Sequence, residues 1–129
     1  MAKLIMCKGL PASGKSTWAC SQNCQVVNKD YLRTIYTSEK KVLEIRDSLI
    51  KCYLKQGMDV ICDDTNLNPK HEQRLRQIAE ELSAKFEIKE FDISVEEAVR
   101  RDKERLKPVG AMVIRHFYNK WIKNNGASV

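Results

Sequence analysis

The chain has 129 residues, with 23 Lys and Arg against 17 Asp and Glu, which gives a formal net charge of +6 and a pI of about 9.1. This length fits one domain, so we expect residues 1–129 to form a single unit. A basic surface suits a polyanionic partner, although many soluble proteins share this charge balance. The sequence has neither an apolar stretch of about 18 residues nor the layout of a signal peptide, so we expect a cytoplasmic protein with no membrane partner.

The cysteines are odd in number, and no two have the C-x-x-C spacing of a zinc or redox site. The two histidines, His71 and His116, are too scattered to complete a zinc set. We therefore expect buried, reduced thiols of a cytosolic protein. The five cysteines are Cys7, Cys20, Cys24, Cys52 and Cys62.

A phosphate-binding motif follows the first predicted strand, Lys3–Lys8. It reads Gly9-Leu10-Pro11-Ala12-Ser13-Gly14-Lys15-Ser16, a complete G-x-x-x-x-G-K-[ST] loop, and leads into a segment free of Gly and Pro. Glycines allow backbone N–H groups to surround phosphate oxygens, and the helix that follows directs its positive end to the same place. We expect Lys15 to reach the β- and γ-phosphates of ATP or another nucleoside triphosphate, and Ser16 to hold Mg²⁺. An ordinary Gly-rich turn would need neither residue.

The second predicted strand, Gln25–Asn28, is followed by Asp30 and Arg33. These residues would face the cleft into which the γ-phosphate points. Phosphoryl transfer needs a carboxylate that orients the acceptor hydroxyl and takes its proton, and Asp30 fits this role. Arg33 could bind an acceptor phosphate in a bidentate manner. In the alternative interpretation, Asp30 caps the next helix and Arg33 is a solvated surface charge.

A predicted helix at Glu39–Gln56 precedes the third predicted strand, Met58–Asp63. An acidic residue that ends a buried strand beside a P-loop holds magnesium, directly or through its water shell. Asp63 or Asp64 could serve, and the strand end with the Thr-Asn sequence after it favours Asp64. Alternatively, Asp64 and Asn66 only shape a turn. The apolar face of the helix consists of Val42, Ile45, Leu49 and Tyr53.

The C-terminal half contains one more strand and three helices. They are a helix at Pro69–Ser83 with Asn68 as its N-cap, a strand at Phe86–Asp92, a helix from the capping box Ser94-x-x-Glu97 to about Leu106, and a helix from about Val109 to Lys123. Arg101 and Arg105 are four apart and hence on one helix face. A mobile helix that presents them over a triphosphate would neutralise charge in the transition state, although a solvated face is the commoner role of such a run.

Strands that alternate with helices predict βαβ units and a parallel sheet. The expected fold is α/β, a P-loop NTPase-type parallel sheet of about four strands flanked by helices, with a C-terminal lid helix that bears arginines. Ligands of such a sheet bind at the carboxyl ends of its strands. Trp18 is expected to pack in the core, whereas Tyr31 and Tyr36 could either stack on a nucleobase or pack.

With these motifs, the chain resembles the kinase half of phage polynucleotide kinase-phosphatases, which transfer the ATP γ-phosphate to a 5′-hydroxyl of DNA or RNA. The resemblance covers nearly the whole chain in the same order. The P-loop is shared by many families, whereas the stretch 64–69, Asp-Thr-Asn-Leu-Asn-Pro, combined with Asp30 and Arg33 is much narrower. The other shared features are Ser16-Thr17-Trp18, Asn28-x-Asp30, a strand that ends in Phe91-Asp92, and Arg101 with Arg105.

The resemblance implies a role for each matching residue. Asp30 would be the general base, and Arg33 would bind the 3′-phosphate of the acceptor. Lys15 and Arg105 would be catalytic, and Ser16 would hold Mg²⁺ with Asp64, the latter directly or through water. Together with the loop motif, the expected ATP contacts are Gly9, Ala12, Ser13, Gly14, Lys15, Ser16, Thr17, Arg101 and Arg105.

Three departures from the family limit what the resemblance implies. The phosphatase half with its Asp-x-Asp motif does not match any part of the sequence, so 3′-end healing is not expected. Ala12 stands where a second P-loop glycine is common, which slightly constrains the loop. The helical region between Arg33 and Met58 is short, so acceptor contacts from it are not carried over.

The expected function is an ATP- and Mg²⁺-dependent polynucleotide 5′-hydroxyl kinase of nucleic-acid end repair, in the host cytoplasm if a phage encodes it. Its partners would be 5′-hydroxyl ends of DNA or RNA, and both a monomer and a homo-oligomer are compatible with the sequence. One alternative is a small-molecule or mononucleotide kinase, against which the basic pI and Arg33 argue modestly. The other is a non-catalytic module that binds ATP and nucleic acid, but a mere binder has no need of a base at Asp30.

Overall fold

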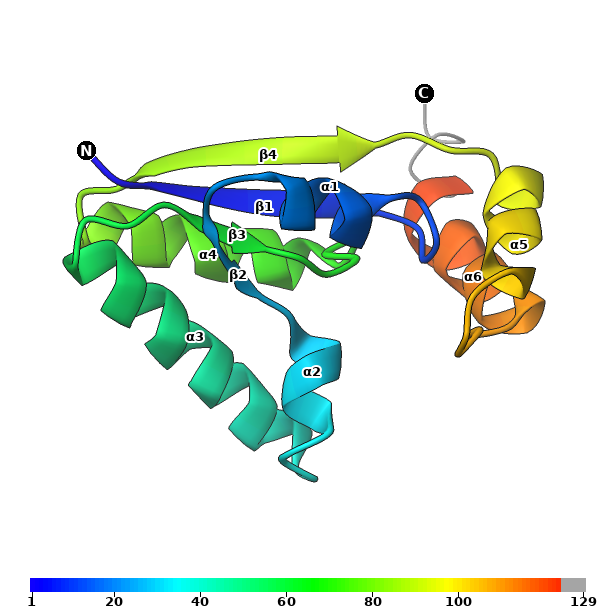
Figure 1. Cartoon of the computed structure of the whole chain (residues 1–129), viewed down its shortest axis with the longest axis horizontal. Helices are drawn as coiled ribbons and strands as arrows, with labels where there is room; N and C mark the ends of the chain where they lie inside the picture. The colour runs from blue at the N-terminus through cyan, green and yellow to red at the C-terminus, as the bar shows by residue number, and fades with distance from the viewer. Residues whose placement is uncertain (124–129) are drawn as a thin grey trace.

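The computed structural model describes residues 1–123 and contains a parallel sheet of four strands (Figure 1). The strands are β1 (Lys3–Gly9), β2 (Gln25–Val27), β3 (Val60–Cys62) and β4 (Lys85–Phe91), in the order β2-β3-β1-β4. All neighbouring strands in this sheet are parallel. The predicted strands are therefore confirmed, each within two residues at either end.

β1 lies inside the sheet, between β3 and β4, and is buried on both faces. Leu4 and Met6 are fully buried on one face, and Ile5 and Cys7 are buried on the other. In the register of the sheet, Ile5 pairs with Ile61 of β3. A continuous apolar run is typical of a parallel strand that is covered on both faces, which makes this segment recognisable from the sequence alone.

The helices follow the predicted order. The bounds of two helices in the C-terminal part differ from the prediction, and α2 (Lys29–Arg33) is an additional short helix. They are α1 (Lys15–Ser21), α2 (Lys29–Arg33), α3 (Glu39–Lys55), α4 (Pro69–Glu81), α5 (Val95–Lys103), α6 (Ala111–Phe117) and the π-helix η1 (Tyr118–Lys123). The helix predicted from the capping box at Ser94 is confirmed, but α5 ends at Lys103 rather than at about Leu106. The last helix begins after Gly110, whose φ of 98° is incompatible with a helical residue.

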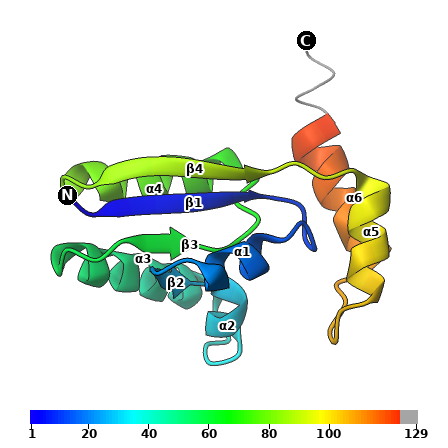
Figure 2. The same ribbon diagram turned by 45° about the horizontal axis from the view of Figure 1, so that its top comes forward.

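Helices cover both faces of the sheet, and α1 and α4 lie on opposite sides of it (Figures 1 and 2). α3 and α4 bury the main core against one face. α1 covers the other face, where Trp18 and Ala19 pack against β1 and β3. The buried residues of the main core are Leu4, Met6, Val27, Leu32, Val42, Ile50, Leu54, Val60, Cys62, Leu75, Ile78 and Ala79.

A separate apolar cluster holds the C-terminal helices beyond the carboxyl end of β4 (Figure 1). Val95, Ala98 and Ile114 of α5 and α6 contact Leu10 of the P-loop and Leu67 of the segment after β3. We call α5, α6, η1 and the loop between α5 and α6 the lid. The lid is thus packed on the two loops that end β1 and β3 rather than on the sheet itself.

The buried face of α3 differs from the predicted one. Val42 is buried as expected, but the other buried positions are Arg46, Ile50 and Leu54, and the predicted Ile45, Leu49 and Tyr53 are partly buried beside them. After Val42, each buried position of α3 thus lies one residue later than predicted, and the charged residue Arg46 is one of these buried positions.

Arg46 is 1% exposed and belongs to a network that joins α3 to α4. Its Nη2 donates to Oδ1 of Asp47 at 2.8 Å, and Oδ2 of Asp47 accepts from Nε of Arg74 on α4 at 2.9 Å. Nη1 of Arg46 lies 3.3 Å from Nδ1 of His71, also on α4. A buried guanidinium is tolerated only with such partners.

All five cysteines are free thiols. Cys7 and Cys62 are buried, whereas Cys20 and Cys52 are exposed, so the expectation of buried thiols is wrong for the latter pair. No helix within residues 1–123 has the length and apolar character to span a membrane.

We predict that Gly9→Ala lowers the free energy of unfolding by about 2–3 kcal/mol, the upper part of the usual cost of overpacking. A Cβ added at Gly9 would lie 2.7 Å from the carbonyl oxygen of Phe91, where β1 meets β4. Urea unfolding followed by circular dichroism measures the loss. Gly57→Ala is the control, because Gly57 has a φ of 78° but nothing within 4 Å of the added atom, and strain alone should cost about 1 kcal/mol. Equal losses in the two variants would contradict the steric explanation.

Candidate active site

A cavity of about 710 Å³ opens at the carboxyl end of the sheet, bounded by the P-loop, the start of α2, the segment after β3 and the lid. Its position and size are those of a ligand site in an α/β protein, for which about 300–1,000 Å³ is typical. The predicted site residues that line it are Ala12, Gly14, Lys15, Ser16, Thr17, Asp30, Arg33, Asp64, Arg101 and Arg105. Gly9 and Ser13 lie outside the lining, and both contact the side chain of Lys15.

The P-loop backbone adopts positive φ at two positions. Gly14 has a φ of 100° and caps α1 without a side-chain hydrogen bond, which suits glycine. Ala12 has a φ of 64°, a conformation that costs a residue with a Cβ about 1–2 kcal/mol. The substitution of alanine for a common glycine therefore leaves the loop geometry in place at the expense of strain.

Lys15 is 7% exposed, and its amine is held by the P-loop itself. Nζ donates to the carbonyl oxygens of Gly9 at 3.0 Å and Leu10 at 2.5 Å, and to Oγ of Ser13 at 3.2 Å. Burial lowers the pKa of Lys15 to about 8. The charge thus lies under the loop, beside the part of the cavity that the motif assigns to phosphates.

The two carboxylates after β3 have different partners. Oδ2 of Asp63 accepts from Oγ of Ser16 at 2.8 Å and from Nδ2 of Asn28 at 3.3 Å. Oδ1 of Asp64 accepts from the backbone N–H of Lys29 at 3.0 Å, and burial raises the pKa of Asp64 to about 6. Asp63 therefore faces the P-loop serine, whereas Asp64 positions the start of α2. This geometry favours Asp63 for the metal position, and the role expected of Asp64 stays a prediction.

The P-loop side of the cavity fits a nucleotide-bound Mg²⁺. Within residues 1–123, no three His, Cys, Asp or Glu side chains gather as a ready-made metal site. Mg²⁺ does not need one when it binds with a nucleotide, since it keeps several waters and takes phosphate oxygens with one or two protein ligands. The oxygen pair of Ser16 and Asp63 meets this requirement.

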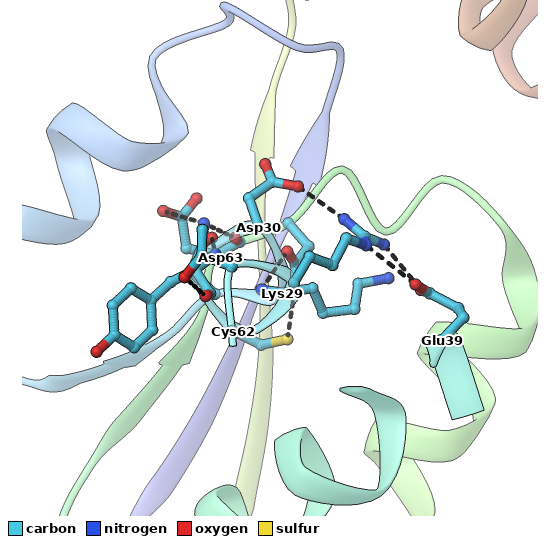
Figure 3. Close-up of polar contacts among 10 residues, drawn as sticks. Lys29, Asp30, Glu39, Cys62 and Asp63 are labelled. Carbon is cyan, nitrogen blue, oxygen red and sulfur yellow. Dashed lines mark hydrogen bonds and ion pairs between the residues drawn. The ribbon is translucent and has the colours of Figure 1, made fainter. Parts of the chain in front are cut away.

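Asn28, not Asp30, caps α2, so the interpretation of Asp30 as a helix cap is wrong. Oδ1 of Asn28 accepts from the backbone N–H of Tyr31 at 3.0 Å. Asp30 lies in the first turn with its side chain 80% exposed, and its Oδ1 accepts from Nη1 of Arg33 at 2.7 Å (Figure 3). Nε and Nη2 of Arg33 also donate to Glu39 at 3.0 and 2.8 Å. The contact between Glu39 and Arg33 was not predicted, because Glu39 has the sequence position of the first residue of a helix.

The lid brings Arg101 and Arg105 to the cavity, but not on one helix face. Arg105 follows the end of α5, and Nε of Arg101 donates to Glu97 at 3.1 Å. Asp102, 2% exposed, accepts from the backbone N–H groups of Val109 at 3.0 Å and Gly110 at 2.9 Å. It also lies 3.4 Å from Nη1 of Arg105. Asp102 therefore fixes the loop that carries Arg105. Its role was not predicted, because Asp102 lies among several other charged residues in the sequence.

One wall of the cavity is apolar and comes from the lid. It consists of Val109, Val113, Phe117 and Trp121, each four residues after the last. Val109 precedes α6, Val113 and Phe117 lie on α6, and Trp121 lies on η1. A flat apolar wall beside charged groups can stack a nucleobase. The spacing is visible in the sequence, but it is also typical of an ordinary helix core.

The other aromatic residues considered for base stacking lie outside the cavity lining. Trp18 packs edge-on against Phe91 with ring centroids 5.8 Å apart, so the prediction of core packing is confirmed. Tyr36 packs against the main core. Tyr31 is 66% exposed and does not line the cavity.

Comparison with known proteins places these features in a family. A family model described as an AAA domain matches residues 4–117. The chain is 30% identical over 132 residues to the L-seryl-tRNA(Sec) kinase of Methanococcus maripaludis, an alignment that covers 92% of this chain and 52% of the relative. The chain therefore spans about half the length of this curated relative.

Solved structures share the fold. A chain of the Pnkp1/Rnl/Hen1 RNA repair complex superimposes with a TM-score of 0.82 at 26% identity, over 99% of this chain and 46% of that one. The Mycobacterium tuberculosis APS kinase CysC, solved with AMPPNP and APS, gives a TM-score of 0.66 at 19% identity, over 78% of this chain and 68% of that one. The predicted α/β fold of P-loop type is confirmed.

We predict that neutral His71 makes stability sensitive to acid. Burial, with Lys29 and Arg46 nearby, lowers the pKa of His71 from 6.5 to about 4. Because the folded-state pKa lies below the unfolded value, this contribution is present above pH 6.5 and is lost as the pH falls through about 4. Wild type should lose more free energy of unfolding over this range than His71→Gln, which retains an acceptor for Arg46.

Urea unfolding at a series of pH values measures this difference. His116→Gln, a change at an exposed histidine, serves as the control and should follow the wild type. If His71→Gln shows the wild-type pH dependence as well, the buried histidine makes no contribution.

Proposed function

Since the chain belongs to the AAA domain family, we propose that it is an ATP-dependent polynucleotide kinase that transfers the γ-phosphate of ATP to the 5′-hydroxyl end of DNA or RNA. One observation carries the proposal: Asp30 and Arg33 line the same cavity as Lys15 and Ser16 of the P-loop. A phosphate-binding loop and a candidate base with an adjacent arginine thus open into one space. The likeness to a chain of the Pnkp1/Rnl/Hen1 RNA repair complex supports a nucleic-acid acceptor.

On the acceptor side, Asp30 is the candidate general base. Arg33 donates to its Oδ1, and within residues 1–123 no hydrogen bond engages its Oδ2. The free oxygen can therefore accept the proton of a 5′-hydroxyl while the arginine fixes the orientation of the carboxylate. Glu39 holds the other edge of the same guanidinium, so both side chains are pre-positioned.

On the donor side, positive charge surrounds the place expected for the triphosphate. ATP with Mg²⁺ supplies the phosphoryl group when bound. Lys15 under the loop and Arg101 and Arg105 from the lid would balance the charge that develops during transfer. Ser16 and Asp63 would hold the metal or its waters. The apolar wall of the lid offers a surface for a nucleobase.

A second candidate function is phosphorylation of a serine hydroxyl on an aminoacyl-tRNA. The 30% identity to an L-seryl-tRNA(Sec) kinase favours it, with 92% of this chain covered. The two candidates require the same donor site and the same base. They differ in the acceptor, which is a ribose or deoxyribose 5′-hydroxyl in one case and an amino-acid side chain in the other.

A single transfer assay tests both. The protein is mixed with γ-labelled ATP, Mg²⁺ and a panel of acceptors: 5′-hydroxyl DNA and RNA oligonucleotides, the same strands already 5′-phosphorylated, seryl-tRNA, nucleosides and sugars. Label on the 5′-hydroxyl strands alone supports the proposal. Label on seryl-tRNA alone favours the second candidate, and label on nucleosides or sugars alone indicates a small-molecule kinase. Lys15→Ala provides the inactive control.

Asp30→Asn should lower the turnover rate by about two to four orders of magnitude, which is the usual contribution of a positioned base. Nucleotide affinity, measured by calorimetry with a non-hydrolysable ATP analogue, should change little because the carboxylate lies on the acceptor side. Glu44→Gln makes the same chemical change at an exposed position of α3 and should leave turnover intact. Loss of nucleotide binding with high residual turnover would show that Asp30 has a structural or metal role instead.

Arg33→Ala should weaken acceptor binding, since a charge-assisted contact contributes about 1.5–3 kcal/mol. Wild type should prefer a nucleoside 3′-phosphate to a bare nucleoside, and the variant should lose much of this preference. The dependence of oligonucleotide binding on salt should also become shallower. Arg115→Ala, at an exposed arginine of α6, is the matched control. Equal use of both acceptors by the wild type would favour a small-molecule kinase.

A further inference from the structure

The acceptor side of the cavity contains a buried cation that the reaction scheme above does not use. Lys29, the first residue of α2, is 6% exposed and lines the cavity. Its backbone N–H donates to Asp64, but within residues 1–123 no hydrogen bond or ion pair engages its amine. Figure 3 shows the side chain extending toward Glu39 with no contact drawn between the two. Burial lowers the pKa of Lys29, as expected of an ammonium removed from water without a partner.

The charges around Lys29 determine the electrostatic environment that an acceptor phosphate would meet. Arg33 is bound to two carboxylates, Asp30 and Glu39, so these three groups together carry a net charge of −1. His71 is neutral near pH 7, because burial lowers its pKa to about 4. Without Lys29, a phosphate that approached Arg33 would therefore meet a locally negative surface.

Arg46 and Asp64, the other charged groups near Lys29, already have partners within the protein. The guanidinium of Arg46 is paired with Asp47. Asp64 is held by the backbone of α2 and forms no ion pair with the Lys29 amine. Within residues 1–123, Arg33 and Arg46 on this side of the cavity are paired with carboxylates, whereas Lys29 forms no ion pair and keeps all the donors of its amine for a ligand.

We propose that Lys29 binds the phosphate group of the acceptor that lies nearest the reacting hydroxyl, and so makes the site select anionic acceptors. This inference rests on the proposed function, because it concerns the acceptor of the same reaction. Lys29 and Asp30 both line the cavity, so the amine can hold a phosphate of the same molecule whose hydroxyl lies at the carboxylate. A bare nucleoside or sugar would gain no contact with the ammonium, and this difference provides discrimination.

Binding measured without turnover tests the inference. Adenosine 3′-phosphate and adenosine are each titrated by calorimetry into wild type, Lys29→Met and Lys29→Arg. Lys29→Met should weaken binding of adenosine 3′-phosphate by roughly 10- to 100-fold and leave binding of adenosine within about twofold. Lys29→Arg should keep most of the preference. Lys40→Met removes the same charge from an exposed position of α3 and should bind both ligands as wild type does.

Several outcomes would overturn the inference. One is unchanged binding of adenosine 3′-phosphate by Lys29→Met, and another is an equal loss for both ligands, which would indicate a structural role. A matching loss in Lys40→Met would reduce the effect to general charge. If Lys29→Met does not fold, wild type with ¹³C-methylated lysines replaces it, and the Lys29 signal, assigned from the Lys29→Arg spectrum, should shift with adenosine 3′-phosphate and not with adenosine. Absence of that shift equally overturns the inference.

The transfer assay keeps this inference separate from the proposed function. Transfer of label to 5′-hydroxyl strands, together with unchanged phosphate binding by Lys29→Met, would leave the function standing and remove the role of Lys29. Lys29-dependent phosphate binding without transfer to any 5′-hydroxyl would support the anion site and overturn the proposed function.

Discussion

The end of β3 is the point that both sides of the cavity depend on. Asp63 accepts hydrogen bonds from Ser16, on the helix after the P-loop, and from Asn28, which caps α2. Asp64 accepts from the backbone of Lys29 in the same helix. Two consecutive carboxylates therefore tie the phosphate-binding helix to the helix that carries the candidate base. Because β3 is fully buried between β2 and β1, the spacing of donor and acceptor sides is set by the sheet rather than by flexible loops.

The lid is attached to the rest of the molecule by apolar contacts. Its apolar cluster reaches the rest of the molecule through Leu10 and Leu67, which lie in the loops after β1 and β3. Its own internal order depends on Asp102, a buried carboxylate with backbone and guanidinium partners. The arginines of the lid are thus placed by a small unit that rests on the same loops that form the phosphate site.

The sequence predicts the fold well, because β1 and β3 are apolar runs, most of β4 alternates charged and apolar residues, and α3, α4 and α5 begin at recognisable N-caps. The sequence also predicts the P-loop and the acidic residues after β2 and β3, because these motifs consist of residues that are neighbours in the chain. It fails where contacts between distant segments decide. Arg46 interrupts an apolar face because partners on α3 and α4 satisfy it, and the different partners of Asp63 and Asp64 depend on which way β3 faces. The tertiary roles of Glu39, Lys29 and Asp102 likewise leave no local signature.

The three hydrogen bonds from the Lys15 amine to its own loop have a consequence for nucleotide exchange. An incoming triphosphate must replace two carbonyls and a hydroxyl, so the net gain is the difference between anionic and neutral acceptors rather than the full interaction energy. When the nucleotide leaves, the same oxygens would accept hydrogen bonds from the amine again. The loop would thereby compete with a bound nucleotide, which lowers its affinity relative to a loop whose lysine had no such partners.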